Sequence, residues 1–323
     1  MDEKARHPIL MTFGTVAILG PGLIGGSLAL ALAERGLTDR LVIYARNDTS
    51  FPAISAKLPQ AELTTDVSQA VRGADVVVLC VPIEAMVGLV REFRDALKPG
   101  ALVTDVGSVK GSVDRDLAPL LEGRALWIGS HPMAGSEKSG FAAARADLFD
   151  RALVILTPPD RRNKTEALEK AYNFWKGIMR DGRVVWIEPE YHDLVVAEIS
   201  HLPHFLASLL LYRLTETGRE LVPELKKMPY SSTQALEFAG PGFRDTTRTA
   251  SGSPELWTEI LWDNRSALSE HVGALMSLLA NVKGILNEHD SEKGKREIFK
   301  ILKSSQSKRA ELLDLNNKRT LQP

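Results

Sequence analysis

The chain has 323 residues, of which 44% are hydrophobic and 25% are charged, a composition typical of globular proteins long enough for two domains. Its 40 basic and 41 acidic side chains give a formal net charge of −1, which offers no argument for a nucleic-acid partner. The single cysteine, Cys80, excludes a disulfide framework within the chain. We find no apolar stretch approaching the roughly 18 residues that span a bilayer and no signal-peptide pattern, so we predict a cytoplasmic protein with no membrane partner.

A glycine fingerprint follows the first apolar run, Val16–Leu19, and leads into an Ala/Leu-rich helix. Its spacing, G-x-G-x-x-G, lets the chain turn sharply, lets backbone approach a pyrophosphate and lets the helix pack on the strand. The N–H groups at the helix start would then face the phosphates. The alternative is a tight strand-to-helix turn with no ligand. The cofactor contacts predicted from this turn are Gly20, Gly22, Leu23, Ile24 and Gly25.

The end of the second apolar run, Leu41–Tyr44, bears on the choice of dinucleotide. An Asp or Glu there, about 20 residues past the glycines, would hold the ribose 2′-hydroxyl of NAD. This chain has Ala45 followed by Arg46, whose guanidinium can pair with a 2′-phosphate. We therefore predict that Arg46 binds the cofactor and that NADP is preferred over NAD. Two alternatives remain: Arg46 is a solvated loop cation, or Asp48 reaches the ribose.

The first part of the chain alternates apolar runs with helical patterns, which predicts a Rossmann-type, mostly parallel sheet covered on both faces. Ligands of such sheets bind at the carboxyl ends of the strands, so we add Val81 and Pro82 to the predicted cofactor contacts. We assign residues 1–188 to this dinucleotide-binding domain. The further apolar runs are Val76–Val81, Leu102–Asp105, Trp127–Gly129, Leu153–Leu156 and Val184–Ile187.

Residues 189–323 show no convincing strand, and we predict an all-α domain there. Apolar residues recur at helical spacing in Tyr191–Leu214, with Pro203 as a kink. Trp257–Asn287 reads as one or two long amphipathic helices, and Glu297–Leu313 as a further helix followed by a frayed tail. Helical domains of this kind often build a dimer interface.

Four polar segments carry the side chains suited to chemistry: Thr104–Lys110, Ser130–Gly140, Ser200–His204 and Gly242–Arg248, the last expected to be a loop. A hydride-transfer oxidation needs a base for the alcohol proton, and a histidine that follows a strand is suited to that task. The alternative for such a histidine is a purely structural role. The two histidines of Ser200–His204 lack a third metal ligand, so we predict no metal site.

The motifs GPGLIGGS, VTDVGSVK, SHPMAGSEKSG, SHLPH and FRDTTRTASGSPELW together resemble the prephenate/arogenate (cyclohexadienyl) dehydrogenases of tyrosine biosynthesis. The resemblance spans roughly Thr15 to Asn287. It implies oxidative decarboxylation of prephenate or arogenate, giving 4-hydroxyphenylpyruvate or tyrosine, by hydride transfer to NAD(P)⁺. It also implies a homodimer built through the helical domain. NAD-type members of this family carry Asp at the position of Ala45, which again favours NADP.

The resemblance also implies roles for single residues. His131 would take the proton of the substrate hydroxyl, and Ser108 would hold the His131 imidazole and approach the nicotinamide. Arg248 would bind the ring carboxylate. The remaining substrate contacts that it implies are Arg244, His204, Glu137 and Trp257.

Two other functions compete with this interpretation. Hydroxyacid and imine reductases of the same two-domain plan use a lysine on the first long helix of the second domain, whereas Tyr191–Leu214 contains none. A non-catalytic NADP-binding sensor would need the cofactor site but not His131 together with Arg248. The sequence leaves the choice between prephenate and arogenate open.

Overall fold

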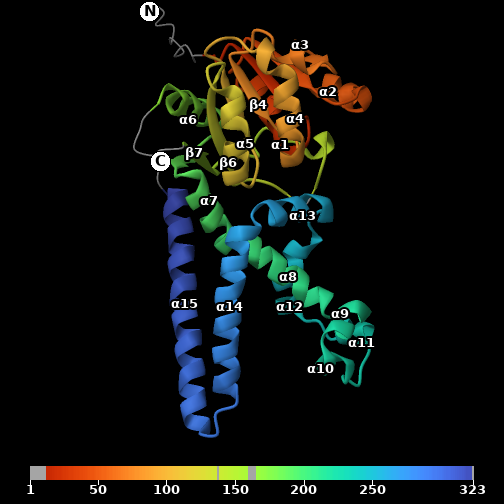
Figure 1. Ribbon diagram of the computed structural model, residues 1–323, viewed down its shortest axis with the longest axis vertical. Helices are drawn as coiled ribbons and strands as arrows, with labels where there is room; N and C mark the ends of the chain where they lie inside the picture. Colours follow the sequence, from red (N-terminus) through yellow and green to blue (C-terminus); the bar gives the residue numbers. More distant parts are fainter. Residues whose placement is uncertain (1–11, 137, 159–164, 322–323) are drawn as a thin grey trace, which may run out of the picture. The chain divides into compact units, whose positions relative to one another are not determined.

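The computed structural model describes residues 12–136, 138–158 and 165–321, with backbone alone from residue 316 onward (Figure 1). Within these residues the strands form one eight-stranded sheet in the order β3-β2-β1-β4-β5-β6-β7-β8, parallel except for the antiparallel pair β6–β7. The strands are β1 Thr15–Leu19, β2 Arg40–Tyr44, β3 Glu62–Thr64, β4 Val76–Leu79, β5 Leu102–Asp105, β6 Leu126–Pro132, β7 Leu153–Thr157 and β8 Arg183–Trp186.

Helices cover both faces of the sheet because both faces of its central strands are apolar. In β1, Val16 and Ile18 join a core with α1 and α6, whereas Ala17 and Leu19 join a second core with α3, α4 and α5. The helices of this part are α1 Leu23–Glu34, α2 Phe51–Lys57, α3 Val67–Val71, α4 Ile83–Phe93, α5 Gly111–Leu121 and α6 Glu166–Ile178. The predicted Rossmann-type fold is confirmed.

The strand order reverses at β1, which pairs with β2 on one side and with β4 on the other. Two consecutive crossovers therefore leave β1 in opposite directions, and ligands of such sheets typically bind at this switch point. One strand was missed by the sequence analysis. β3 has three residues, none of them buried, and so carries almost no apolar signal.

From Pro189 onward the described chain is helical, as predicted. The first long helical run consists of α7 Pro189–Val196, a π-helical turn Ala197–His201 and α8 Leu202–Tyr212. In the π turn, the Leu202 N–H donates to the Ala197 carbonyl, five residues back. Pro203 has no N–H to give, and its ring crowds the carbonyl four residues earlier, so the helix widens just before it. The kink expected at Pro203 is thus a π-helical turn just before the proline.

The run Pro189–Tyr212 also corrects the sequence analysis. By length and composition it could cross a membrane, with a mean hydropathy of 1.6 in its most apolar window. The statement that no apolar stretch approaches that length was therefore wrong, because the polar residues that interrupt the run are too few to lower its average. Only 28% of that window is buried, and two of its polar residues, Asp193 and His201, are buried and hydrogen-bonded within the folded unit.

Shorter helices follow: α9 Glu216–Leu221, α10 Pro223–Lys226, α11 Ser232–Glu237, α12 Pro241–Thr247 and α13 Pro254–Asp263. The segment Gly242–Arg248, expected to be a loop, is instead helical. Gly240 caps α12 and Pro241 occupies its first turn, which is a favourable start for a helix. The loop expectation rested on glycine and threonine content and overlooked this start signal.

The chain divides into two compact units, residues 1–264 and 265–323. The second unit contains α14 Arg265–Leu286 and α15 Ser291–Leu321, which contact each other as a helical hairpin. The tail expected to fray after Leu313 continues as helix to Leu321. The domain boundary placed between residues 188 and 189 stays a prediction.

Candidate active site

The glycine turn has the shape that a dinucleotide pyrophosphate requires. Gly20 has a φ of +107°, and a Cβ there would lie 2.7 Å from the Cys80 carbonyl oxygen. A Cβ on Gly25 would overlap the Gly20 carbonyl oxygen, so this glycine allows α1 to pack against the turn. A Cβ on Gly22 would meet nothing within 4 Å. Gly22 is also the N-cap of α1 and offers no capping side chain, so the first N–H groups of α1 stay available to an anion.

The residues on either side of this turn end neighbouring strands. Ala45, which follows β2, is buried, and Arg46 beside it is exposed. Asp48 is exposed and lies in a 3₁₀ turn whose N-cap is Asn47. On the other side of β1, Pro82 follows β4 and caps the start of α4. No carboxylate therefore stands directly at the end of β2.

His131 lies in β6 beside a second buried histidine that the sequence analysis did not select. Its Nδ1 is 2.8 Å from Nε2 of His192, which belongs to α7. Nδ1 of His192 is in turn 2.8 Å from a carboxylate oxygen of Asp193. The three side chains form a continuous row, in which His192 is fully buried and His131 and Asp193 are each 9% exposed.

Asp193 is held by the beginning of α5. The backbone N–H groups of Lys110 and Gly111 donate to its two carboxylate oxygens, both at 2.8 Å. A Cβ on Gly111 would lie 2.8 Å from the nearer oxygen, so a glycine at this position lets the carboxylate approach. The helix N-terminus stabilises the negative charge through these free donors and its dipole. This contact joins α7 to the sheet.

A buried ion pair supports the strand ends next to His131. The Lys110 ammonium pairs with Asp105 at the end of β5 and donates to the Ser130 carbonyl at 2.9 Å. Asp105 also accepts from the backbone N–H groups of Gly107 and Ser130. Burial lowers the pKa of Lys110, and the neighbouring Asp105 opposes this shift.

Ser108 is half-buried in the turn between β5 and α5. Among the described residues it makes no hydrogen bond to His131, whose Nδ1 faces His192 instead. The structure thus differs from the expectation that Ser108 holds the imidazole. A catalytic or cofactor-contacting role for Ser108 stays a prediction.

A second cluster lies along the π turn and α8. Asn264 is buried and donates both to the Asp193 carbonyl, at 2.8 Å, and to Nδ1 of His201, at 3.1 Å. His204 stacks on Trp257 with ring centroids 3.4 Å apart and planes inclined by 12°. The structure therefore brings together two of the predicted substrate contacts, His204 and Trp257.

Arg244 and Arg248 are both exposed and lie four residues apart. Arg244 belongs to α12, and Arg248 begins the 3₁₀ turn Arg248–Ser251, both of which contact α8. The spacing allows both guanidinium groups to serve one anionic ligand. Glu137, predicted to contact substrate, lies outside the described residues.

Burial keeps the site histidines neutral. The pKa of His131 lies well below its usual value, mainly because burial penalises the charged form, with His192 and Lys110 adding to the effect. Burial also lowers the pKa of His192, against the opposing effect of Asp193. It lowers the pKa of His201 to about 4. A neutral imidazole is the form that accepts a proton.

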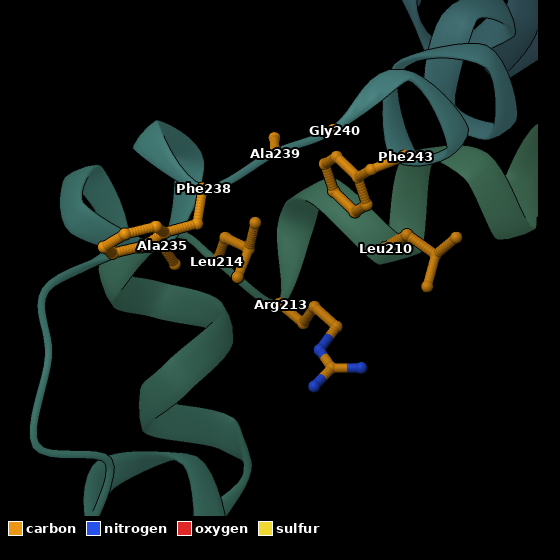
Figure 2. A pocket seen from close by; sticks show the side chains of 8 residues that line it. All are labelled: Leu210, Arg213, Leu214, Ala235, Phe238, Ala239, Gly240 and Phe243. Carbon is orange, nitrogen blue, oxygen red and sulfur yellow. The ribbon is translucent and has the colours of Figure 1, made fainter.

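A cavity of about 330 Å³ lies away from these residues. Figure 2 shows Phe243 and Leu210 on one side of it and Phe238, Ala235 and Leu214 on the other. Its one charged lining residue is the exposed Arg213. None of the predicted site residues lines it. Among the described residues, no group of three His, Cys, Asp or Glu side chains suits a metal ion.

A dinucleotide cradle after β1 and a buried histidine in β6 of the same sheet are features expected of a nicotinamide-dependent dehydrogenase. Comparison with known families specifies it further. Residues 28–185 match the nucleotide-binding domain of prephenate dehydrogenase, and residues 188–304 match its dimerization domain. The chain belongs to the prephenate dehydrogenase family.

Individual relatives agree with this assignment. The chain is 34% identical to a cyclohexadienyl dehydrogenase from Zymomonas mobilis over 88% of its own length and 92% of that protein. It is 32% identical to a prephenate dehydrogenase from Bacillus subtilis over 91% of its length and 75% of that protein.

Among solved structures, prephenate dehydrogenase from A. aeolicus in complex with hydroxyphenyl propionate and NAD⁺ has a TM-score of 0.78 at 29% identity. The match covers 95% of this chain and all of that one. Arogenate dehydrogenase from Synechocystis has a TM-score of 0.75 at 28% identity, covering 92% and 99% of the two chains.

The glycine geometry predicts different outcomes for two substitutions. Gly22→Ala should leave the fold intact, because its Cβ points into open space, but should weaken dinucleotide binding about tenfold or more by occupying the path of the pyrophosphate. Gly25→Ala should lower Tm by several degrees through overpacking. Thermal unfolding and dinucleotide titration measure the two effects. Equal dinucleotide affinity in wild type and Gly22→Ala would contradict the assigned role of Gly22.

Proposed function

We propose that this protein catalyses the oxidative decarboxylation of prephenate or arogenate, with NAD(P)⁺ as hydride acceptor. The observation that carries this proposal is the buried His131, whose Nδ1 is engaged by His192. Its Nε2 has no hydrogen-bond partner among the described residues and is suited to accept a proton. Family membership supports the choice of substrate class.

The residues have the following parts in the proposed reaction. Nε2 of His131 takes the proton of the ring hydroxyl while the C–H bond of the carbon that bears this hydroxyl breaks. The nicotinamide, when bound, supplies the acceptor for the hydride. The bond to the ring carboxylate then breaks, carbon dioxide leaves, and the electron pair of that bond completes the aromatic ring. The resulting phenolate oxygen takes back the proton held at Nε2 of His131, which restores the neutral imidazole. The product is 4-hydroxyphenylpyruvate from prephenate or tyrosine from arogenate.

Binding of the substrate falls to the helical segment. We assign the ring carboxylate to Arg248, with Arg244 close by, because exposed guanidinium groups one helical turn apart can bind carboxylates. The stacked pair His204 and Trp257 would flank the substrate. Ser108 and Glu137 keep their proposed places, at the nicotinamide and at the mouth of the site.

We propose that NADP⁺ is preferred over NAD⁺. Ala45 offers no acceptor for a ribose 2′-hydroxyl, and the exposed Arg46 follows it at the switch point of the sheet. We further propose residues 1–188 as the dinucleotide-binding domain and residues 189–323 as the helical domain that forms a homodimer. The family match to a dimerization domain supports the latter.

The first experiment crosses prephenate and arogenate with NAD⁺ and NADP⁺ and records reduced nicotinamide. Turnover in any combination supports the proposed function, and the best combination assigns substrate and cofactor together. The absence of turnover in all four, with dinucleotide binding intact, would overturn it in favour of another reductase or a sensor.

Replacing the base should lower turnover selectively. His131→Asn removes the proton acceptor, so kcat should fall by about 10²–10⁴-fold while dinucleotide affinity changes little. Steady-state kinetics and dinucleotide titration measure these quantities. His289→Asn, in the exposed turn between α14 and α15, is the control and should retain wild-type rates. An active His131→Asn variant would exclude this residue as the base.

The pH profile should reflect the burial of His131. Because burial disfavours the imidazolium and lowers the pKa, the base stays unprotonated below pH 6.5, the usual value for histidine. We therefore expect kcat/KM to stay level from neutral pH through 6.5 and to fall only at lower pH. Rates measured across this range test the prediction, and an acid limb with a midpoint at or above 6.5 would contradict it.

Cofactor choice should depend on the residues after β2. Arg46→Gln should lower kcat/KM with NADP⁺ by about 10–100-fold, the worth of a charge-assisted hydrogen bond, and leave the value with NAD⁺ nearly unchanged. Ala45→Asp should shift preference toward NAD⁺. Arg115→Gln, an exposed arginine of α5, serves as the matched control. Equal losses with both cofactors in Arg46→Gln would refute the proposed contact.

A further inference from the structure

We propose that His192 and Asp193 are positioning residues that fix His131 in one tautomer, with the proton on Nδ1 and a bare Nε2 facing the substrate. This inference rests on the proposed function of His131 as the base. It adds a second histidine and a carboxylate that lie 61 and 62 residues further along the chain. The assignment follows from which nitrogens in this row can donate and accept, together with the burial of His192.

The logic starts at Asp193. A carboxylate can only accept hydrogen bonds, and the two oxygens of Asp193 accept from two backbone N–H groups at the start of α5. The His192 nitrogen that faces the carboxylate, at 2.8 Å, must then be the donor. Nδ1 of His192 therefore carries a hydrogen.

The next step concerns Nε2 of His192. If His192 is neutral, this nitrogen has only a lone pair and accepts from Nδ1–H of His131 across 2.8 Å. If His192 were an imidazolium, it would donate instead and His131 would carry its proton on Nε2. Complete burial of His192 and the nearby Lys110 ammonium both oppose that charge. The neutral form leaves Nε2 of His131 bare.

The row also helps after proton transfer. Once His131 has taken the substrate proton at Nε2, its Nδ1–H faces a neutral acceptor, and the charge of Asp193 stands one residue behind. The positive charge that develops on His131 is thereby stabilised without a carboxylate in direct contact. Asp193 does not move to do this, because the start of α5 and the Asn264 amide hold its carboxylate and its carbonyl.

The competing explanation is that these bonds only attach α7 to the sheet. That role requires no particular tautomer of His131, so a direct measurement of tautomer separates the two. We would label the histidines with ¹⁵N in the full-length protein at neutral pH and assign His131 by comparison with His131→Asn. The expected result is a protonated Nδ1 and an unprotonated Nε2. A protonated Nε2 on His131 would overturn the proposal, whatever the activity.

Variants extend the test to kinetics. His192→Phe keeps a ring but removes the acceptor, so Nε2–H should become populated on His131. Its kcat should then fall by more than about tenfold, but not beyond the loss in His131→Asn, while KM and dinucleotide affinity change little. His192→Gln supplies an amide oxygen for Nδ1–H and should restore part of kcat. Tyr191→Phe, an exposed neighbour on α7, is the control and should match wild type.

The outcomes separate this inference from the proposed function. If neither prephenate nor arogenate is turned over, the proposed function fails, and the tautomer of wild-type His131 still decides the positioning role. If turnover is present and His192→Phe retains full kcat with an unprotonated Nε2, the positioning role fails alone. The wild-type spectrum needs no variant, so a His192 variant that fails to fold leaves the proposal open to refutation.

Discussion

The contact of Asp193 with the start of α5 is the constraint on which the rest of the site depends. It joins a residue of the helical segment to backbone donors 82 and 83 residues away in the sheet domain. A buried carboxylate is costly unless its oxygens are satisfied, and here backbone N–H groups and a histidine satisfy them. Because the carboxylate is fixed, α7 is fixed, and with α7 the ring of His192 that faces His131.

The π turn Ala197–His201 sets the orientation of the histidines that follow it. Asp193 and His192 lie on α7, whereas His201 lies at the end of the π turn and His204 in α8. A regular helix through this stretch would rotate the later histidines by a different amount. The extra residue in the turn, caused by Pro203, sets His201 against Asn264 and His204 against Trp257.

Local signals in the sequence predicted the sheet and the tight glycine turn after β1 well. The glycine turn could be recognised because its constraints, a positive φ at Gly20 and a close approach at Gly25, act within a few residues. β3 escaped because its three residues are not buried. The helix at Pro241–Thr247 escaped because its glycine content outweighed its start signal. The high mean hydropathy of Pro189–Tyr212 was missed because polar residues interrupt its apolar runs.

The catalytic surroundings were harder to predict because they depend on contacts between distant parts of the chain. His131 was found from its position after an apolar run, but the partner of its Nδ1 could not be read from the sequence. In the sequence, His192 and Asp193 look like ordinary polar residues near the start of a helix. Nothing in their local sequence indicates that they contact His131. The resemblance to known motifs pointed to Ser108 instead, whereas the structure places the bond at His192.

The arrangement also explains why a histidine, rather than the nearby lysine, is suited to be the base. Lys110 is completely buried, but its ammonium is paired with Asp105 and bonded to the Ser130 carbonyl. To act as a base it would have to lose its proton and leave Asp105 as an unpaired buried charge, which is strongly unfavourable. His131 needs no such change, since burial already holds it neutral. The lysine thus stabilises the strand ends, and the imidazole of His131 remains the proposed base.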